Sequence, residues 1–580
     1  MAVFEMETGR ARLSLACQGA VGRADQLDAG TKWHFEQETV ERGQTTWRFV
    51  ADRTCWTQKQ LAVVLTADEA LFRLEVEGRG AIDRVTYFAG YPADLVAEPR
   101  ATLNQLPWAR RPWARAWSGS PRTFQKVSNP QPNAYEEQYL DAGVAQRITC
   151  ATTFGPEVFN TFFAPPLYAY VFDQAICLGV VAPTEQSRFN HFDYVPAAGW
   201  GLELHYDGMT RVDGTWTSPA IRVAACDSAE KGLEAYAGHL RTCGCAPGTG
   251  APTPDWAHQP IFCGWGQQTV WAHESEVGAA TPSTGSPVTP GAGGYATQAA
   301  YELMVGLLEQ HDIPYGTLTI DMGWSTCLTI PVPDADKWPD LKGFVERLHR
   351  QGKRVLLWLA AWNPGGLDAG LRMPHAPSLA DCCDPSNPEF SRQLAEAVDR
   401  AVSPAGLGAD GFKLDFSGDL PRGQGYSPAA DTWGLSLLHR YVKLVHDAMK
   451  AAKDDTVLET HCASPHFADV TEMLRLNDIF CSREDVRPMM AFRARMARIA
   501  LPGAAIDTDN DPFVSKAAWL DYLRFQPQLG VPSLYTLTHM SSAQQGLAPE
   551  ALAASDMSEV SRIWHTYMSS LSSGYASPPA

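Results

Sequence analysis

The sequence predicts a multidomain protein of the α/β plus all-β class, with an amino-terminal antiparallel β-sandwich followed by a (β/α)8 TIM barrel. Three observations lead to this prediction. The chain has 580 residues, which is more than one hydrophobic core normally organises. Short strand-like segments recur between turn residues in the first part of the chain. Later in the chain, strand-like segments alternate with helical ones, which indicates parallel βα units.

The β-sandwich is predicted to span residues 1–250. Segments such as 61–65 (LAVVL) and 71–76 (LFRLEV) lie between turn residues and have the composition of strands. Residues 247–254 are rich in Pro, Gly, Thr and Ala, and the periodicity changes after them. We therefore expect a linker there and place the barrel domain at residues 256–570.

Eight strands are expected in the second domain, with helices between them. The predicted strands are 261–265, 317–321, 354–359, 411–416, 457–462, 479–481, 504–507 and 531–536. The predicted helices include 296–311, 341–351, 388–402, 431–452, 487–500 and 516–525. Eight parallel βα units in about 300 residues are typical of a closed barrel, whose catalytic groups lie at the carboxyl ends of the strands.

Composition argues against several classes of partner and location. The net charge of −18 and the pI of about 5.3 disfavour nucleic acid and anionic membranes, which need basic faces. No apolar stretch approaches the thickness of a bilayer, and the amino terminus lacks a basic region followed by an apolar run, so we expect a cytoplasmic protein. The 13 cysteines are scattered and lack paired CxxC spacing, which predicts reduced thiols rather than a zinc site.

Two predicted strands end in a carboxylate that alternation directs into the barrel. In the fourth strand, one face carries Phe412, Leu414 and Phe416. That apolar face is expected to meet the helices, so Lys413 and Asp415 point inward, where the lysine would hold the carboxylate ionised. The second strand repeats the pattern and ends in Asp321, a candidate for binding a substrate hydroxyl. The alternative is a structural ion pair for Asp415, and a capping or salt-bridging role for Asp321.

Four strand-end motifs occur in order along the barrel. They are 320–324 (IDMGW), 411–415 (GFKLD), 458–464 (LETHCAS) and 482–485 (SRED). Their ordered co-occurrence resembles the clan of retaining α-glycosidases that includes glycoside hydrolase family 36, the α-galactosidases and raffinose-synthase-like proteins. The resemblance covers about residues 259–570, and the preceding β-sandwich matches the usual amino-terminal domain of the family.

The resemblance implies a retaining, exo-acting, α-galactosidase-like hydrolase with Asp415 as the nucleophile. It places the general acid/base in the SRED motif, where Asp485 is our choice. Family members usually have an Asp directly after the serine, but Arg483 stands there, so Glu484 is a competitor and Asp478 a weaker one. If Asp485 is the acid/base, retention requires its carboxyl to lie about 5 to 5.5 Å from that of Asp415.

Two departures from the family leave the substrate open. In α-galactosidases the second-strand motif carries two adjacent Asp residues, whereas Met322 follows Asp321 here. Arg483 and Arg487 lie beside the expected acid/base, so an anionic substituent on the sugar is one hypothesis and salt bridges to Glu484 or Asp485 are the other. The alternatives are an α-glucosidase or another α-glycosidase, including one for an anionic sugar, a transglycosylase, or a non-catalytic carbohydrate-binding protein.

Further candidate substrate-binding residues lie at or near strand ends. With Asp321 and Lys413, they are Trp265, Trp324, Trp358, Cys462, Arg483 and Glu484. Core packing explains the tryptophans equally well, and a buried thiol explains the cysteine. Trp362 and His539 are weaker candidates of the same kind.

No metal or organic cofactor is expected. The acidic run 507–511 lacks the glycine and the distal glutamate of an EF-hand, so Asp507 or Asp509 is expected to line the pocket rather than bind a metal. The expected partner is a small-molecule carbohydrate substrate, and a homo-oligomer is left open.

Overall fold

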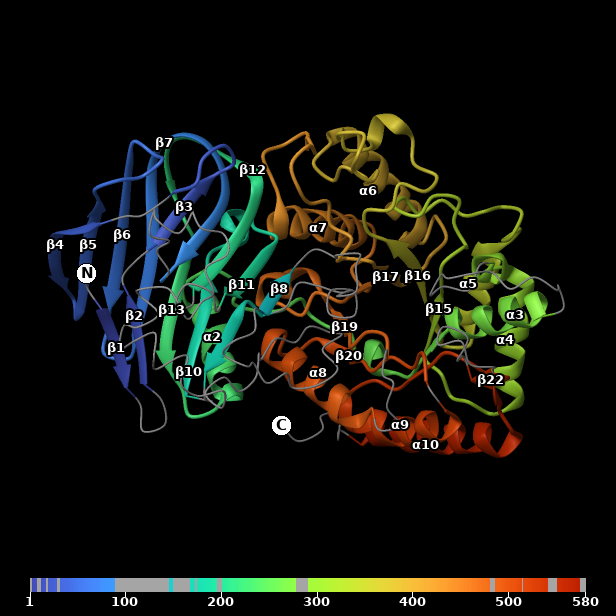
Figure 1. The fold of residues 1–580 in the computed structure, drawn as a ribbon. Coiled ribbons are helices and arrows are strands. Elements are labelled where there is room, and N and C mark those ends of the chain that lie inside the picture. Colours follow the sequence, from blue (N-terminus) through green and yellow to red (C-terminus); the bar gives the residue numbers. More distant parts are fainter. Residues whose placement is uncertain are drawn as a thin grey trace.

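The computed structural model describes an antiparallel β domain and a parallel barrel (Figure 1). The described residues are 3–7, 12–16, 19–28, 32–88, 146–149, 167–172, 175–195, 201–277, 291–479, 486–513, 515–540 and 550–573. Within these ranges, no helix is both long enough and apolar enough to cross a bilayer.

In the described part of the β domain, eleven strands form one branched antiparallel sheet. They are β3 (Gly19–Arg23), β4 (Trp33–Glu41), β5 (Gln44–Ala51), β6 (Gln58–Leu65), β7 (Glu69–Tyr87), β8 (Gln146–Thr149), β9 (Ala169–Phe172), β10 (Ile176–Val181), β11 (His191–Val195), β12 (Gly201–Thr217) and β13 (Ala220–Ala225). A separate hairpin pairs β1 (Val3–Glu7) with β2 (Arg12–Ala16). The predicted antiparallel β domain is thus confirmed, whereas its division into two packed sheets stays a prediction.

Strand β7 organises this sheet, because it pairs with β3, β6, β12 and β13. Along β7, Phe72, Leu74 and Val76 are buried and alternate with charged residues, as a strand with one covered face requires. Helix α2 (Ala229–Thr242) packs beside β10, where Tyr236 donates a hydrogen bond to the carbonyl of Val180 at 2.6 Å.

The barrel contains eight parallel strands in the order β20-β19-β18-β17-β16-β15-β14-β21. Their bounds are β14 (Ile261–Cys263), β15 (Thr317–Ile320), β16 (Arg354–Ala360), β17 (Gly411–Asp415), β18 (Val457–Thr460), β19 (Met473–Arg475), β20 (Ala505–Asp507) and β21 (Ser533–Leu534). A parallel bridge between Asp507 and Val531 joins the two ends of this order. The sheet is therefore a nearly closed barrel, as predicted.

Two strand predictions need correction. The sixth strand was expected at 479–481, but it is β19, in which Met473 pairs with Glu459 of β18 and Ala505 of β20. Asn477 has a φ of 73°, which ends the extended conformation before the apolar segment that suggested a strand. The first strand also ends earlier than predicted, because helix α3 (Trp265–Val277) begins directly after it and includes Trp265.

Helices follow the strands and cover the outside of the barrel. They are α3, α4 (Gln298–Gln310), α5 (Leu341–Arg350), α6 (Pro388–Val402), α7 (Gly434–Ala452), α8 (Arg487–Ala500), α9 (Lys516–Leu529) and α10 (Ala554–Ser572). The bounds of α6 and α8 agree with the prediction. Asn387 caps α6 by accepting a hydrogen bond from the backbone N–H of Glu389 at 2.9 Å, and Pro388 opens the helix.

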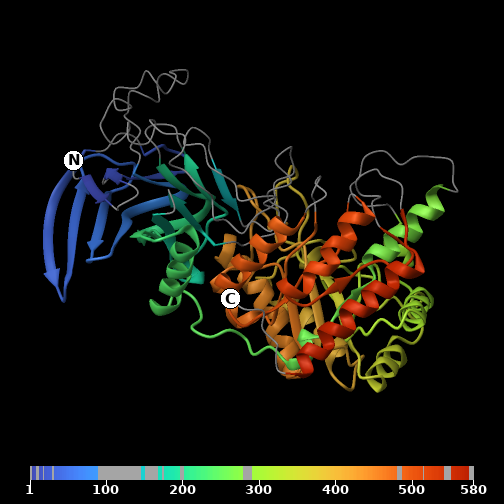
Figure 2. The same ribbon diagram turned by 90° about the horizontal axis from the view of Figure 1, so that it is seen from below.

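The β domain lies beside the barrel (Figure 2) and contacts the loops at its strand ends. His466, in the short helix η9 (Pro465–Val470) after β18, has its Nε2 2.9 Å from the carbonyl oxygen of Ala182. Arg188 pairs at 2.7 Å with Asp431 in the loop after β17. These contacts attach the β domain to the two loops that follow the central strands of the barrel.

Candidate active site

Asp415 is the last residue of β17, where the strand turns. Phe412 and Leu414 are fully buried, while the side chains of Lys413 and Asp415 point into the barrel. The alternation ends at Asp415, because Phe416 has a φ of 57° and its ring contacts Trp358 edge to face. The backbone N–H of Phe416 donates to Asp415 Oδ1 at 2.9 Å, so the turn itself helps to hold the carboxylate.

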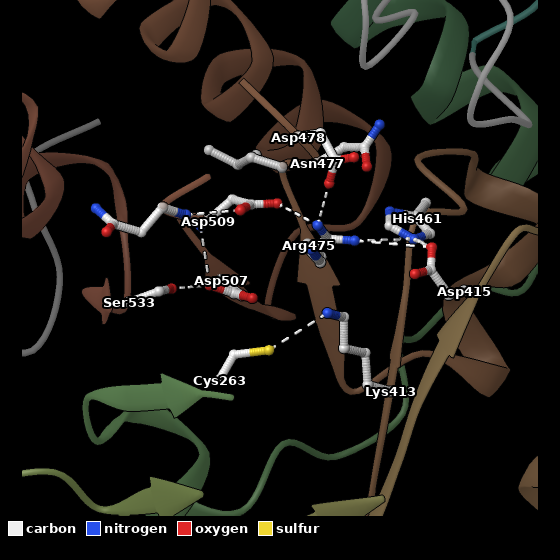
Figure 3. A network of polar contacts seen from close by, with 12 residues as sticks. Cys263, Lys413, Asp415, His461, Arg475, Asn477, Asp478, Asp507, Asp509 and Ser533 are labelled. Carbon is white, nitrogen blue, oxygen red and sulfur yellow. Dashed lines mark hydrogen bonds and ion pairs between the residues drawn. The ribbon is translucent and has the colours of Figure 1, made fainter. Parts of the chain in front are cut away.

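Both oxygens of the Asp415 carboxylate accept hydrogen bonds from neighbouring strands. His461 Nε2, just after β18, lies 2.9 Å from Oδ1. The indole N–H of Trp358, on β16, donates to Oδ2 at 3.1 Å. Figure 3 shows His461 beside Asp415, with Arg475 between them and Asp507 and Asp509 of the β20 segment. The carboxylate therefore has a fixed orientation at the end of the barrel.

The surroundings of Asp415 keep it ionised. Burial alone would raise its pKa, but the hydrogen bond from His461 and the charges of Arg475 and Lys413 outweigh burial and hold the pKa well below its ordinary value. Burial also lowers the pKa of His461 to about 4, so this imidazole is neutral at pH 7. The tautomer with hydrogen on Nε2 follows, because the carboxylate can only accept.

Lys413 forms its ion pair with Asp321 rather than with Asp415. Its Nζ lies 2.8 Å from Asp321 Oδ2, and both side chains are buried. The thiol of Cys263 on β14 also contacts Asp321 Oδ2, at 3.1 Å. The predicted influence of Lys413 on Asp415 thus acts through charge at longer range. Asp321 is a salt-bridging residue, as the alternative interpretation expected, and its contact with a substrate hydroxyl stays a prediction.

Arg475, the last residue of β19, is the central cation of the site and was missed by the sequence analysis. Its Nη1 lies 3.8 Å from Asp415 Oδ1, and its Nη2 lies 2.6 Å from Asp509 Oδ2. The same Nη2 also pairs with Asp478. The sequence places the sixth strand at 479–481, so it does not identify Arg475 as a strand-end residue. Alternation along the fifth strand, in which Glu459 and His461 are two residues apart, would have indicated His461.

Asp478 has the properties of a group that exchanges a proton near neutral pH. Its side chain contacts Arg475 and is 25% exposed. Burial raises its pKa to about 6, with the negative charges of Asp509 and Asp415 acting in the same direction and Arg475 acting against them. Burial also raises the pKa of Asp509 and, strongly, that of Asp511. The arrangement therefore places an ionised carboxylate and a protonatable carboxyl on one guanidinium.

Glu459 and Asp507 form a second pair of buried carboxyl groups. Glu459 is paired in register with Lys413, and it faces Asp507 of β20. Burial raises the pKa of Glu459 well above its usual range, and the charge of Asp507 adds to this, so Glu459 is protonated. Asp507 accepts from the backbone N–H of Asp509 at 3.0 Å. Asp507 and Asp509, the two candidates from the acidic run, thus lie at the end of β20 and in the loop that follows it.

Other predicted residues are placed apart from the Asp415 carboxylate. Trp324 is fully buried and its indole N–H donates to the carbonyl of Trp358 at 2.8 Å. Cys462 is also fully buried, and burial raises its pKa to about 12. Neither side chain is accessible to a ligand in this structure, so both correspond to the core-packing alternative.

The remaining candidates lie elsewhere. Trp265 is the partly exposed first residue of α3. Trp362 is buried, with its indole N–H donating to the carbonyl of Ser417 at 3.0 Å. His539 belongs to the short strand β22 (His539–Met540). Arg487 pairs with Asp521 at 3.1 Å on the surface of α8 and α9, a different partner from the Glu484 or Asp485 of the salt-bridge alternative. The predicted residues Arg483, Glu484 and Asp485 lie outside the described ranges.

The fold and these strand-end groups define a (β/α)8-barrel protein with charged groups at the face where such barrels carry their active sites. No family model and no curated protein sequence matches the chain. Solved structures with a similar fold include a family 31 sulfoquinovosidase from E. rectale in complex with an aza-sugar inhibitor. Its TM-score is 0.58 at 12% identity, over 99% of this chain and 84% of that one.

Two further similar structures are carbohydrate-active enzymes. The cycloalternan-forming enzyme from Listeria monocytogenes in complex with a pentasaccharide has a TM-score of 0.58 at 12% identity, over 93% of this chain but 55% of that one. A family 31 α-xylosidase from a soil metagenome, complexed with xylose, has a TM-score of 0.51 at 12% identity, over 97% of this chain and 86% of that one. Identities this low show a shared fold only.

The family suggested by the sequence differs from that of two of these similar structures. The resemblance was to family 36, whereas the sulfoquinovosidase and the α-xylosidase belong to family 31 of the same clan. The clan-level expectation is consistent with this shared fold. The α-galactosidase specificity has no support in these structures.

Proposed function

We propose that the protein is a retaining α-glycoside hydrolase that forms a covalent glycosyl-enzyme on Asp415. The observation that carries the proposal is the environment of this carboxylate, which is ionised, hydrogen-bonded on both oxygens and located at the end of a barrel strand. The fold shared with family 31 α-glycosidases supports the same reaction class. The proposal leaves the sugar open and does not include α-galactoside specificity.

In the proposed mechanism, Asp415 attacks the anomeric carbon and displaces the leaving group. A general acid protonates the departing glycosidic oxygen and later deprotonates the water that hydrolyses the β-glycosyl-enzyme. We assign this role to Asp478, because its raised pKa of about 6 suits a group that must first give and then take a proton. Asp485, the residue predicted from the resemblance, and Glu484 are the competing assignments.

The function is tested by activity, stereochemistry and trapping. The full-length protein is assayed on p-nitrophenyl α-glucoside, α-xyloside and α-galactoside and on an α-linked sulfoquinovoside, and the first-formed anomer is identified by NMR. We expect turnover of at least one α-glycoside with retention, and a 5-fluoroglycosyl fluoride of that sugar should label Asp415. Inversion, or the absence of both turnover and label, contradicts the proposal. Transfer to an added sugar acceptor instead of water indicates a transglycosylase.

The assignment of the two carboxyl roles is tested by variants. Asp415→Ala should reduce kcat by at least about 10³-fold, and azide should restore turnover as a β-glycosyl azide. Asp478→Asn should lose about 10²- to 10⁴-fold on substrates with poor leaving groups and much less on activated ones. Asp485→Asn and Glu484→Gln are made in parallel. If one of these two shows the leaving-group dependence and Asp478→Asn does not, the acid/base role moves to that residue.

A further inference from the structure

Arg475 contacts both carboxyl groups to which we assign roles. Its Nη1 faces Asp415 Oδ1 at 3.8 Å, and its Nη2 pairs with Asp478. We infer that Arg475 is a positioning residue, whose planar guanidinium orients the nucleophile and the general acid through its two adjacent terminal nitrogens. This inference rests on the proposed function and adds a residue that neither the sequence motifs nor the proposed mechanism contains.

The position of the Arg475 guanidinium is fixed by the residues around it. Arg475 is at the end of β19, and its side chain is 3% exposed. On the far side, Asp509 Oδ2 forms an ion pair with its Nη2 at 2.6 Å. Asp509 is itself held in the loop after β20, where Gln526 donates to its carbonyl at 2.8 Å. A buried, braced guanidinium loses little freedom when it orients two carboxyl groups, which a flexible lysine would not achieve equally well.

Charge around Arg475 explains why the two carboxyl groups differ. The titratable groups that face it are Lys413 and Asp415 on β17, Glu459 and His461 of the β18 segment, Asp478 on its own loop, Asp507, Asp509 and Asp511 of the β20 segment, and Tyr535 after β21. Lys413 is paired with Asp321 and acts on these carboxyl groups through charge at longer range, whereas Arg475 contacts Asp415, Asp478 and Asp509 directly.

One guanidinium cannot keep every one of these carboxyl groups ionised. Asp415 has three N–H donors on its oxygens, from His461, Trp358 and Phe416, so it retains its charge. Asp478 competes with Asp509 for the same nitrogen of Arg475. Asp478 therefore takes up a proton at a higher pH than Asp415 does. These contacts support the assignment of Asp478 as the acid and of Asp415 as the nucleophile.

The test is the basic limb of the pH profile of kcat/KM, which reports ionisation of the acid. In Arg475→Met, a positive charge is lost beside Asp478, so the basic limb should shift to higher pH by about one pH unit or more. In Asp509→Asn, a negative charge is lost, so the limb should move downward. Arg475→Lys should keep the basic limb near its wild-type pH, because the positive charge stays. It should lower kcat, because the planar guanidinium is lost.

A matched control is Arg524→Met, whose guanidinium pairs with Glu559 at the surface through contacts of 2.7 and 3.0 Å. It should leave both kcat and the basic limb unchanged. Melting curves verify that each variant is folded, and if Arg475→Met is not, the opposite shift in Asp509→Asn remains decisive. If the wild type turns over substrate but the basic limb stays in place in the variants, the inference about Arg475 is wrong and the proposed function is unaffected. Absence of wild-type turnover and of a trapped glycosyl-enzyme overturns the proposed function, and this inference with it.

Discussion

Nε2 of His461 lies 2.9 Å from Oδ1 of Asp415, and this hydrogen bond joins the ends of two neighbouring barrel strands. The ring adds no charge, because burial lowers the pKa of His461 to about 4. The positive charge near Asp415 comes from Arg475 and Lys413 instead. Orientation and charge compensation of the proposed nucleophile thus come from different side chains, and they can be changed separately.

Replacing His461 by Phe tests the orienting part. The variant keeps a ring of similar volume but loses a hydrogen bond to a charged acceptor, so kcat/KM should fall by about 10- to 100-fold. This hydrogen bond lowers the pKa of Asp415, so its loss raises that pKa and activity should disappear at a higher pH on the acidic side. His565→Ala, which removes a surface contact to Asp312, serves as the control. If kcat/KM is lower but activity is still lost at the wild-type pH on the acidic side, the prediction is contradicted.

Trp358→Phe tests the second hydrogen bond to the same carboxylate. The indole N–H donates to Asp415 Oδ2 at 3.1 Å, and a phenyl ring can retain the edge-to-face contact with Phe416. We expect kcat/KM to fall by about 10-fold or more, with little change in melting temperature. Trp324→Phe is the matched control, because its indole N–H serves a backbone carbonyl instead. Equal kinetic losses in both variants would refute a specific role for Trp358.

The parts of the site that the sequence predicts are those governed by local pattern. Alternation along β17 correctly directs Lys413 and Asp415 inward, because the strand is covered by helices on its other face. Helix α6 is recognisable from its Asn cap and first-turn Pro. In each case, a few adjacent residues contain the whole signal.

The parts that the sequence does not predict depend on short or distant elements. Strand β19 has three residues, too few for periodicity, and the apolar segment after Asp478 resembles a strand more closely. The partner of Lys413 is Asp321, which is 92 positions away and separated from it by β16 in the sheet. Alternation gives the direction of a side chain into the barrel, but only the assembled barrel determines which charge it meets.

Lys413→Met tests the energetic role of the buried pair. Removing the ammonium group leaves the Asp321 carboxylate buried without its 2.8 Å partner, so unfolding free energy should fall by about 3 to 5 kcal/mol in urea titrations. The double variant Lys413→Met with Asp321→Leu should recover part of this loss. Lys443→Met removes an exposed pair with Asp447 at 3.0 Å and should change stability by about 0.5 kcal/mol or less. Equal effects at the two sites would contradict the argument.

Asp410, directly before β17, is expected to stabilise the fold without taking part in the reaction. It is fully buried at the opposite end of the strand from Asp415 and accepts from His349, Arg354 and Lys453 at 2.7, 2.9 and 2.7 Å. Asp410→Asn should lower the free energy of unfolding by about 3 kcal/mol at pH 7. Its kcat should stay within about twofold of the wild type, because this end of a barrel serves stability.

The pH dependence of that difference follows from the pKa of Asp410. Burial raises this pKa, but the hydrogen bond from His349 and the charge of Lys453 lower it more, so its value in the folded protein is below that in the unfolded chain. Such a group stabilises the fold above its unfolded pKa of about 3.9, and this contribution is lost as the pH falls toward the folded value. The stability gap between wild type and Asp410→Asn should therefore narrow when urea titrations are repeated at acidic pH. A gap that stays constant from neutral to acidic pH would show that lost packing, rather than the carboxylate charge, accounts for the effect.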